Sequence, residues 1–154
     1  MTILALITWI GAVALGSYLL AIWLIEYDSD FQESAATRLP VPLISSHAVL
    51  ALAGLAVWLA YIVLDQDRLA WISVAILGVV AVLGLTMAVR WIGVYRSYRL
   101  TSRPRILGQR NLPRAGPAVP PERNFPVPVI VIHGLFAFTT ITLVLLTAFG
   151  VGSS

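Results

Sequence analysis

The chain contains two histidines, and each follows the same short motif. Pro40-Val41-Pro42 is followed after four residues by His47, and Pro126-Val127-Pro128 is followed after four residues by His133. The second proline of each motif suits the first turn of a helix, where its missing N–H is not needed, and the first keeps its predecessor extended. The motif therefore predicts two helices with defined starts, each carrying one histidine a turn or so inside, at the same depth.

Two neutral imidazoles at one depth can supply both axial ligands of a haem iron. Ionisable residues within a membrane are costly and indicate a functional site by default. We therefore interpret His47 and His133 as metal ligands of a haem b. The alternative is that each histidine hydrogen-bonds a neighbouring helix or interfacial water. A zinc or copper site is less favoured, because two imidazoles underfill a tetrahedral site and no carboxylate within the expected bundle completes it.

Small residues follow each histidine at helical spacing of four and seven residues. They are Ala51 and Gly54 after His47, and Ala137 and Thr140 after His133. We expect them to leave a slot that admits the porphyrin, with close helix packing as the alternative. Arg38 and Arg123 precede the two motifs and are expected to pair with the haem propionates. The other two helices carry glycines that fit either interpretation: Gly11, Gly16, Gly78 and Gly84.

The composition predicts a membrane protein. The chain has 154 residues, of which 59% are hydrophobic and 11% charged, and its mean hydropathy is +0.91. A soluble domain carries about a quarter charged residues, and a small one cannot bury so much apolar surface. Four apolar runs, at residues 3–25, 43–64, 69–92 and 129–149, have the roughly 20 residues that a membrane span needs. The expected fold is all-α, an integral membrane four-helix bundle forming one domain over residues 1–154.

The arginines predict the orientation of this bundle. Nine of the ten fall on the side that holds residues 26–42 and 93–128, and Arg68 alone falls on the other. The positive-inside rule then makes both loops cytoplasmic and both termini extracytoplasmic, in a cell inner or plasma membrane. Residues 65–68 form a tight hairpin, and the repeated motif suggests two parallel two-helix repeats related by an axis along the membrane normal.

The stretch 93–125 is predicted to be a basic, proline-rich cytoplasmic loop, with the third helix continuing into it as far as Arg99. The segment is either solvated near lipid phosphates or laid against a partner. No nucleic-acid-binding module is recognisable, so nucleic acid is not an expected partner. The chain has no cysteine, which excludes disulfides, thiolate metal sites and covalent haem attachment.

With its four-helix plan and the pair His47 and His133, the chain resembles the small four-helix membrane cytochromes b. Larger members of this kind hold two haems with two histidine pairs, whereas this chain has one pair. The resemblance implies haem b and electron transfer within a respiratory or redox membrane complex. A single haem near one face cannot carry electrons across a core of about 30 Å, so quinone, a cytoplasmic redox partner on the basic loop, or further subunits are the expected partners.

Two other classes of function remain open from the residues. The chain can be a non-catalytic accessory or scaffold subunit of a larger membrane assembly, with structural histidines. A transporter or channel is less favoured, because the apolar runs lack acidic residues and have few polar ones. No catalytic residues are identified, and an electron-transfer or accessory subunit is favoured over a complete enzyme.

Overall fold

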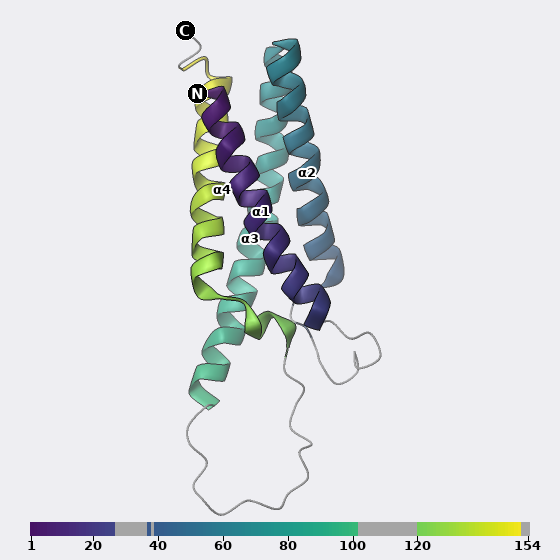
Figure 1. The fold of residues 1–154 in the computed structure, drawn as a ribbon, viewed down its shortest axis with the longest axis vertical. Coiled ribbons are helices and arrows are strands. Elements are labelled where there is room, and N and C mark those ends of the chain that lie inside the picture. Colours follow the sequence, from purple (N-terminus) through teal and green to yellow (C-terminus); the bar gives the residue numbers. More distant parts are fainter. Residues whose placement is uncertain (27–36, 38, 102–119, 152–154) are drawn as a thin grey trace, which may run out of the picture.

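The computed structural model describes residues 1–26, 37, 39–101 and 120–151. Within these ranges the chain forms four α-helices and one short 3-10 helix (Figure 1). They are α1 (Thr2–Glu26), α2 (Val41–Leu64), α3 (Asp67–Thr101), η2 (Pro121–Asn124) and α4 (Val127–Ala148). The prediction of an all-α fold with four long helices is confirmed, and each α-helix is long and apolar enough to cross a membrane.

The helices form two closely packed pairs. α1 packs mainly against α4, and α2 packs mainly against α3. The pairs meet in fewer contacts, between α3 and α4 and between α1 and α2. Going around the bundle, the order is therefore α1, α2, α3, α4, so that α2 and α4 are diagonally opposite (Figure 1). The two histidine-bearing helices face each other across the centre of the bundle.

The two Pro-Val-Pro motifs start α2 and α4 in the same way. Pro40 (φ −59°, ψ 136°) and Pro126 (φ −66°, ψ 120°) are the N-cap residues. The carbonyl of Pro40 accepts hydrogen bonds from N–H groups of residues 43 and 44, and that of Pro126 from those of residues 129 and 130. The second proline of each motif lies in the first turn. The predicted helix starts are confirmed.

The predicted hairpin joins α2 to α3. α2 ends at Leu64, and Asp65 adopts a left-handed conformation (φ 50°) while its N–H bonds the carbonyl of Tyr61. α3 begins at Asp67 and packs antiparallel against α2. It continues to Thr101, so residues 93–101 of the stretch assigned to the basic loop are helical, as expected for a helix that runs on through Arg99.

The buried positions of the two halves correspond. In α1 the buried residues include Ala5, Trp9, Ala12 and Trp23, and the residues 68 positions later in α3, namely Ser73, Leu77, Val80 and Trp91, are buried as well. In α2 the buried residues are Gly54, Trp58 and Tyr61, and those 86 positions later in α4 are Thr140, Val144 and Thr147. Equivalent helices therefore turn equivalent faces to the core.

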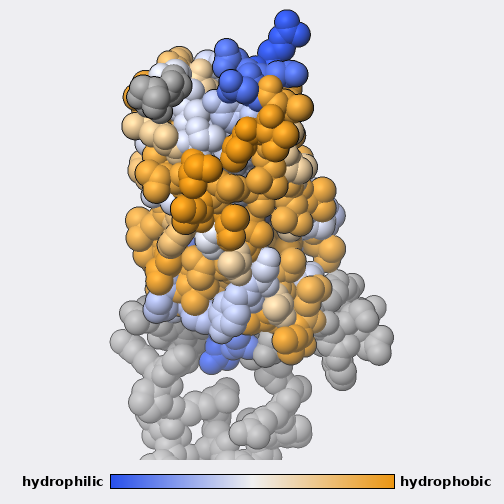
Figure 2. All heavy atoms as spheres, turned by 45° about the horizontal axis from the view of Figure 1, so that its top comes forward, coloured by the Kyte–Doolittle hydropathy of each residue, from blue (hydrophilic) through white to orange (hydrophobic). Residues whose placement is uncertain are grey.

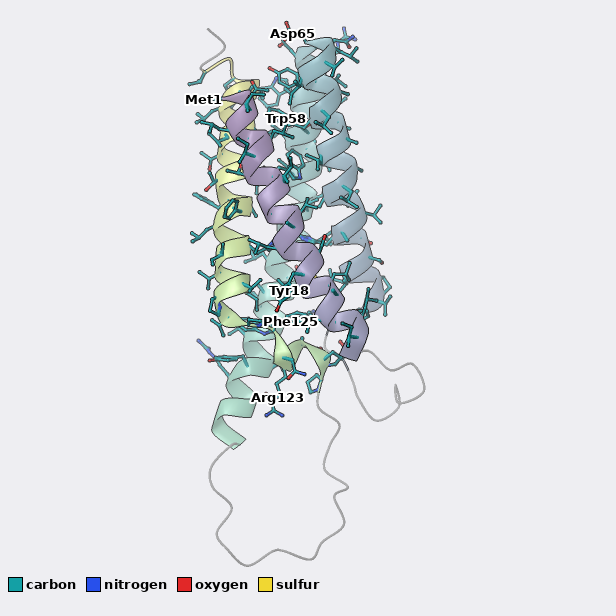
Figure 3. All side chains as sticks on the ribbon, in the orientation of Figure 1. Met1, Tyr18, Trp58, Asp65, Arg123 and Phe125 are labelled. Atoms are coloured by element: carbon teal, nitrogen blue, oxygen red, sulfur yellow. The ribbon has the colours of Figure 1, made fainter. Side chains whose placement is uncertain are left out.

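Large aromatic side chains fill the core toward the end that holds the hairpin and the termini. Trp9 and Trp58 are almost fully buried, with ring centroids 6.5 Å apart, and Tyr61 lies 4.9 Å from Trp58. Figure 3 shows Trp58 on the Asp65 side of the bundle and Phe125 at the opposite end. On the surface shown in Figure 2, apolar side chains cover the middle of the bundle, and hydrophilic residues gather at the end that holds the hairpin.

Candidate functional site

The structure brings the two histidines together. Each is the seventh residue of its helix, His47 in α2 and His133 in α4. A rise of 1.5 Å per residue places both about 9 Å from their helix starts. Their ring centroids lie 6.3 Å apart, and the ring planes form an angle of 62°. The equal depth that the repeated motif predicted thus becomes a pair of neighbouring imidazoles in an edge-on arrangement, between diagonally opposite helices.

A backbone carbonyl holds each imidazole by the same ring atom. Nδ1 of His47 lies 3.1 Å from the carbonyl oxygen of Val80 in α3, and Nδ1 of His133 lies 2.9 Å from that of Ala12 in α1. A carbonyl can only accept, so Nδ1 carries the proton in both rings. A hydrogen bond to a neighbouring helix, the alternative interpretation of each histidine, is therefore present. It leaves the lone pair of each Nε2 available to a ligand.

A glycine one turn beyond each acceptor carbonyl lets the ring lie against the helix backbone. A Cβ on Gly84 would fall 3.0 Å from Cε1 of His47, and one on Gly16 would fall 3.1 Å from Cε1 of His133. Larger residues would displace the rings. The spacing of these two glycines left two interpretations open, a slot for a ligand or close helix packing, and did not predict contact with the histidines. The signal was their equivalence, since Gly16 and Gly84 are 68 residues apart, like the acceptors Ala12 and Val80.

The expected slot beside Ala51 and Gly54 is occupied by a side chain. The indole Nε1 of Trp9 donates to the carbonyl of Ala51 at 3.2 Å. A Cβ on Gly54 would lie 2.9 Å from Cζ2 of Trp9 and 3.0 Å from Cγ2 of Ile76. The expectation of open space at Gly54 is corrected: the missing side chain admits the indole and brings α1 and α3 close to α2. Spacing alone could not distinguish these two uses of a small residue.

The corresponding residues of α4 also serve packing. Thr140 is buried, and its hydroxyl bonds the carbonyl of Phe136 at 2.8 Å and the hydroxyl of Thr8 at 2.9 Å. Ala137 is half-buried. Thr140 therefore contributes to the packing of α4 against α1.

The structure describes one of the two arginines that were expected to pair with the haem propionates. Arg38 lies outside the described residues. Arg123 is exposed on η2, beyond the end of the bundle (Figure 3). Pairing of these arginines with carboxylates of a cofactor stays a prediction.

A buried carboxylate closes the bundle at the same end. Glu122 on η2 is fully buried between the ends of α1 and α3. Its Oε2 accepts a hydrogen bond from Thr37 Oγ1 at 3.1 Å, and its backbone carbonyl accepts one from Trp91 Nε1 at 3.1 Å. Trp23, the counterpart of Trp91, donates to Thr37 Oγ1 at 3.5 Å. Glu122 falls in the stretch predicted to be a basic loop, and no feature of its neighbours in the sequence predicts that its side chain is buried.

Among the described residues, no group of three or more His, Cys, Asp or Glu side chains could hold a metal ion. The histidine pair thus offers two protein ligands in this part of the chain. No protein-family model, curated protein or solved structure matches this sequence. Function must therefore be argued from the site itself.

Proposed function

We propose that this protein is a membrane-embedded haem b protein that transfers electrons, with His47 and His133 as axial ligands. The observation that carries the proposal is the separation of the two rings. Two imidazoles that bind one metal from opposite sides, with bonds of about 2.0–2.1 Å and ring centres about 1.2 Å behind the nitrogens, have centroids about 6.4–6.6 Å apart. The centroids of His47 and His133 are 6.3 Å apart, close to this range. The 62° between the planes is compatible, because each ring can rotate about its own metal–nitrogen bond.

The number of ligands favours haem over a bare metal ion. A zinc site needs three or four protein ligands, whereas haem iron already has four porphyrin nitrogens and takes its axial ligands from the protein. Two imidazoles complete that set. The loosely joined seam between the α1–α4 pair and the α2–α3 pair is where a planar group between the rings would lie.

The protein's own groups would hold and orient the site. The carbonyls of Val80 and Ala12 fix the Nδ1–H tautomer, which directs the lone pair of Nε2 to the ligand position and raises its basicity. Gly84 and Gly16 permit both rings to approach the backbone. When bound, the haem would supply one-electron redox chemistry, which the axial ligands and burial tune.

The surface of the helices supports placement in a bilayer. Large apolar side chains point outward along all four helices, among them Ile25 (82% exposed), Val63 (80%) and Phe138 (71%). The hydroxyls of exposed threonines are hydrogen-bonded within their own helices. Thr86, Thr139 and Thr142 each donate to the backbone carbonyl four residues earlier. Lipid offers no hydrogen bonds, so such internal pairing is what a lipid-facing hydroxyl requires. Both observations favour a multi-pass membrane protein. The distribution of arginines favours an orientation with the termini outside and the η2 end in the cytoplasm.

The depth of His47 and His133 along their helices also suggests the side of the membrane at which electrons are exchanged. The histidines lie about 9 Å from the starts of α2 and α4, at the end that the arginines assign to the cytoplasm. A quinone or a cytoplasmic redox partner could approach this end, while the far half of the bundle is filled by Trp9 and Trp58. The protein would then act as one station of a larger redox complex.

The test is an optical spectrum of the protein purified in detergent after expression with ample haem. We expect a Soret band and one non-covalent haem per chain. Replacing either histidine by Ala should remove the six-coordinate spectrum, and the double replacement should abolish binding. An absent Soret band, or a spectrum that survives the double replacement, would reject the proposal.

A further inference from the structure

The two segments that lead into α2 and α4 are joined by one side-chain contact, and this contact bears on the histidines. Thr37 lies three residues before the N-cap Pro40, and Glu122 lies four residues before the N-cap Pro126. The hydroxyl of Thr37 donates to Oε2 of Glu122 at 3.1 Å. This hydrogen bond links the two segments directly.

The hydroxyl of Thr37 is used fully. Its single proton has two acceptors within reach, Oε2 of Glu122 at 3.1 Å and the carbonyl of Leu39 at 3.2 Å, and the carboxylate is the stronger acceptor. Its lone pairs accept from the backbone N–H of Leu39 at 3.2 Å and from Trp23 Nε1 at 3.5 Å. A hydroxyl has one proton to donate and two lone pairs to accept with. Leu39, which immediately precedes Pro40, is itself buried. Thr37 is therefore fixed to α1 through Trp23 and to the start of α2 through Leu39.

Glu122 is fixed on the other side of the contact. Its carboxylate is fully buried, and its backbone carbonyl accepts from Trp91 of α3 and, at 3.4 Å, from the N–H of Phe125, the residue that precedes Pro126. A buried carboxylate is costly unless it is well bonded, and a hydrogen bond to a charged acceptor is stronger than a neutral one. Two equivalent tryptophans, Trp23 and Trp91, thus hold one contact between the two helix starts.

We infer that Glu122 and Thr37 are positioning residues, which keep the starts of α2 and α4 in register and so hold His47 and His133 at one level. Each histidine is a fixed seven-residue rise from its helix start. A relative shift of the two starts would therefore shift the two rings relative to each other. This role deepens the proposed haem site, and it also predicts an effect on the protein without haem.

The first experiment measures the register directly. The chain has no cysteine, so cysteines introduced at Ser46 and Ile132, the exposed residues that precede the two histidines, can carry spin labels. Dipolar EPR of the haem-free protein should give a narrow distance distribution. We expect Glu122→Ala and Thr37→Val to broaden it at least twofold. Glu122→Gln, which keeps an acceptor oxygen, and Thr37→Ser, which keeps the hydroxyl, should leave it narrow.

The second experiment uses the haem-loaded protein. Transfer of haem to an excess of an acceptor protein should be about tenfold faster for Glu122→Ala than for the wild type, and the high-spin fraction of its bound haem should be larger. Glu122→Gln should return the transfer rate and the high-spin fraction to the wild-type values. Trp91 bonds the backbone of Glu122, so these variants keep that bond.

Unchanged distance distributions in Glu122→Ala would overturn the inference whether or not haem binds, and so would a Gln variant as broad as the Ala variant. If the wild type binds no haem but the distributions change as described, the proposed function fails and the positioning role stands.

Discussion

Gly84 lies so close to the imidazole of His47 that a Cβ at this position would come within 3.0 Å of Cε1. Gly16 has the same relationship to His133, at 3.1 Å. Each contact belongs to a unit that occurs twice: a histidine from one helix, a backbone carbonyl that accepts a hydrogen bond from its Nδ1–H, and a glycine four residues after that carbonyl. The proposed ligand site rests on this duplicated unit more than on either histidine alone.

Substituting either glycine should disturb ligation. In Gly84→Ala and in Gly16→Ala the ring must move by a few tenths of an ångström, which would lengthen the bond from Nδ1 and turn Nε2 away. Loss of such an outer contact lowers metal affinity about 10- to 100-fold, and we expect a decrease in haem affinity in this range for both variants. Haem titration of the purified proteins measures it.

Gly78→Ala is the matched control in α3, because, apart from the adjacent residues and backbone of its own helix, no atom of the described residues lies within 4 Å of its Cβ position. Its haem affinity should equal that of the wild type, and its helix should be stabilised by up to about 1 kcal/mol. Equal affinities for Gly84→Ala and Gly78→Ala would show that the close approach of the ring has no role.

Ser73→Ala should leave the protein as stable as the wild type or raise its free energy of unfolding by about 1 kcal/mol. The hydroxyl of Ser73 is fully buried and has no hydrogen-bond partner among the described residues, and a buried unpaired polar group costs about 1–3 kcal/mol. Ala5 occupies the equivalent position of α1 and is equally buried. Thermal unfolding in detergent checks this, and a lower midpoint for the Ala variant would contradict it.

Gly54→Ala should destabilise the bundle. Its new Cβ would lie 2.9 Å from the indole of Trp9 and 3.0 Å from Ile76, and overpacking of this kind costs about 1–3 kcal/mol. Trp9→Phe, which shortens the ring, should be less harmful in the Gly54→Ala background than in the wild type, because the two residues are in contact. Denaturation of the four proteins gives the coupling; strict additivity would argue against the described packing.

The fold followed from the sequence where one physical requirement dominated. Apolar runs of span length became helices, prolines with fixed φ became helix starts, and the predicted hairpin became a two-residue connection, Asp65 and Gln66, between α2 and α3. The roles of the small residues could not be predicted in the same way, because a small side chain in the sequence is compatible both with space for a ligand and with space for a neighbouring side chain. Gly54 accommodates Trp9, whereas Gly16 and Gly84 accommodate the histidines. Only tertiary packing decides between these outcomes.

Orientation in the membrane can be tested with the same cysteine-free background. A cysteine at Asn124, on η2, should react with a membrane-impermeant maleimide only when the cytoplasmic side is accessible. A cysteine at Gln66, in the hairpin between α2 and α3, should react from the outside. Each position serves as the control for the other, because the two lie at opposite ends of the bundle. The opposite labelling pattern would contradict the predicted orientation and would place the histidines near the outer side of the membrane.

The most direct test of the central claim is EPR spectroscopy of the ferric protein at one haem per chain. If His47 and His133 bind one iron from both sides, the wild type will give a single low-spin signal of the bis-imidazole type. His47→Ala and His133→Ala will each convert it to a high-spin signal. A high-spin signal in the wild type, or a low-spin signal that survives either replacement, would contradict the account.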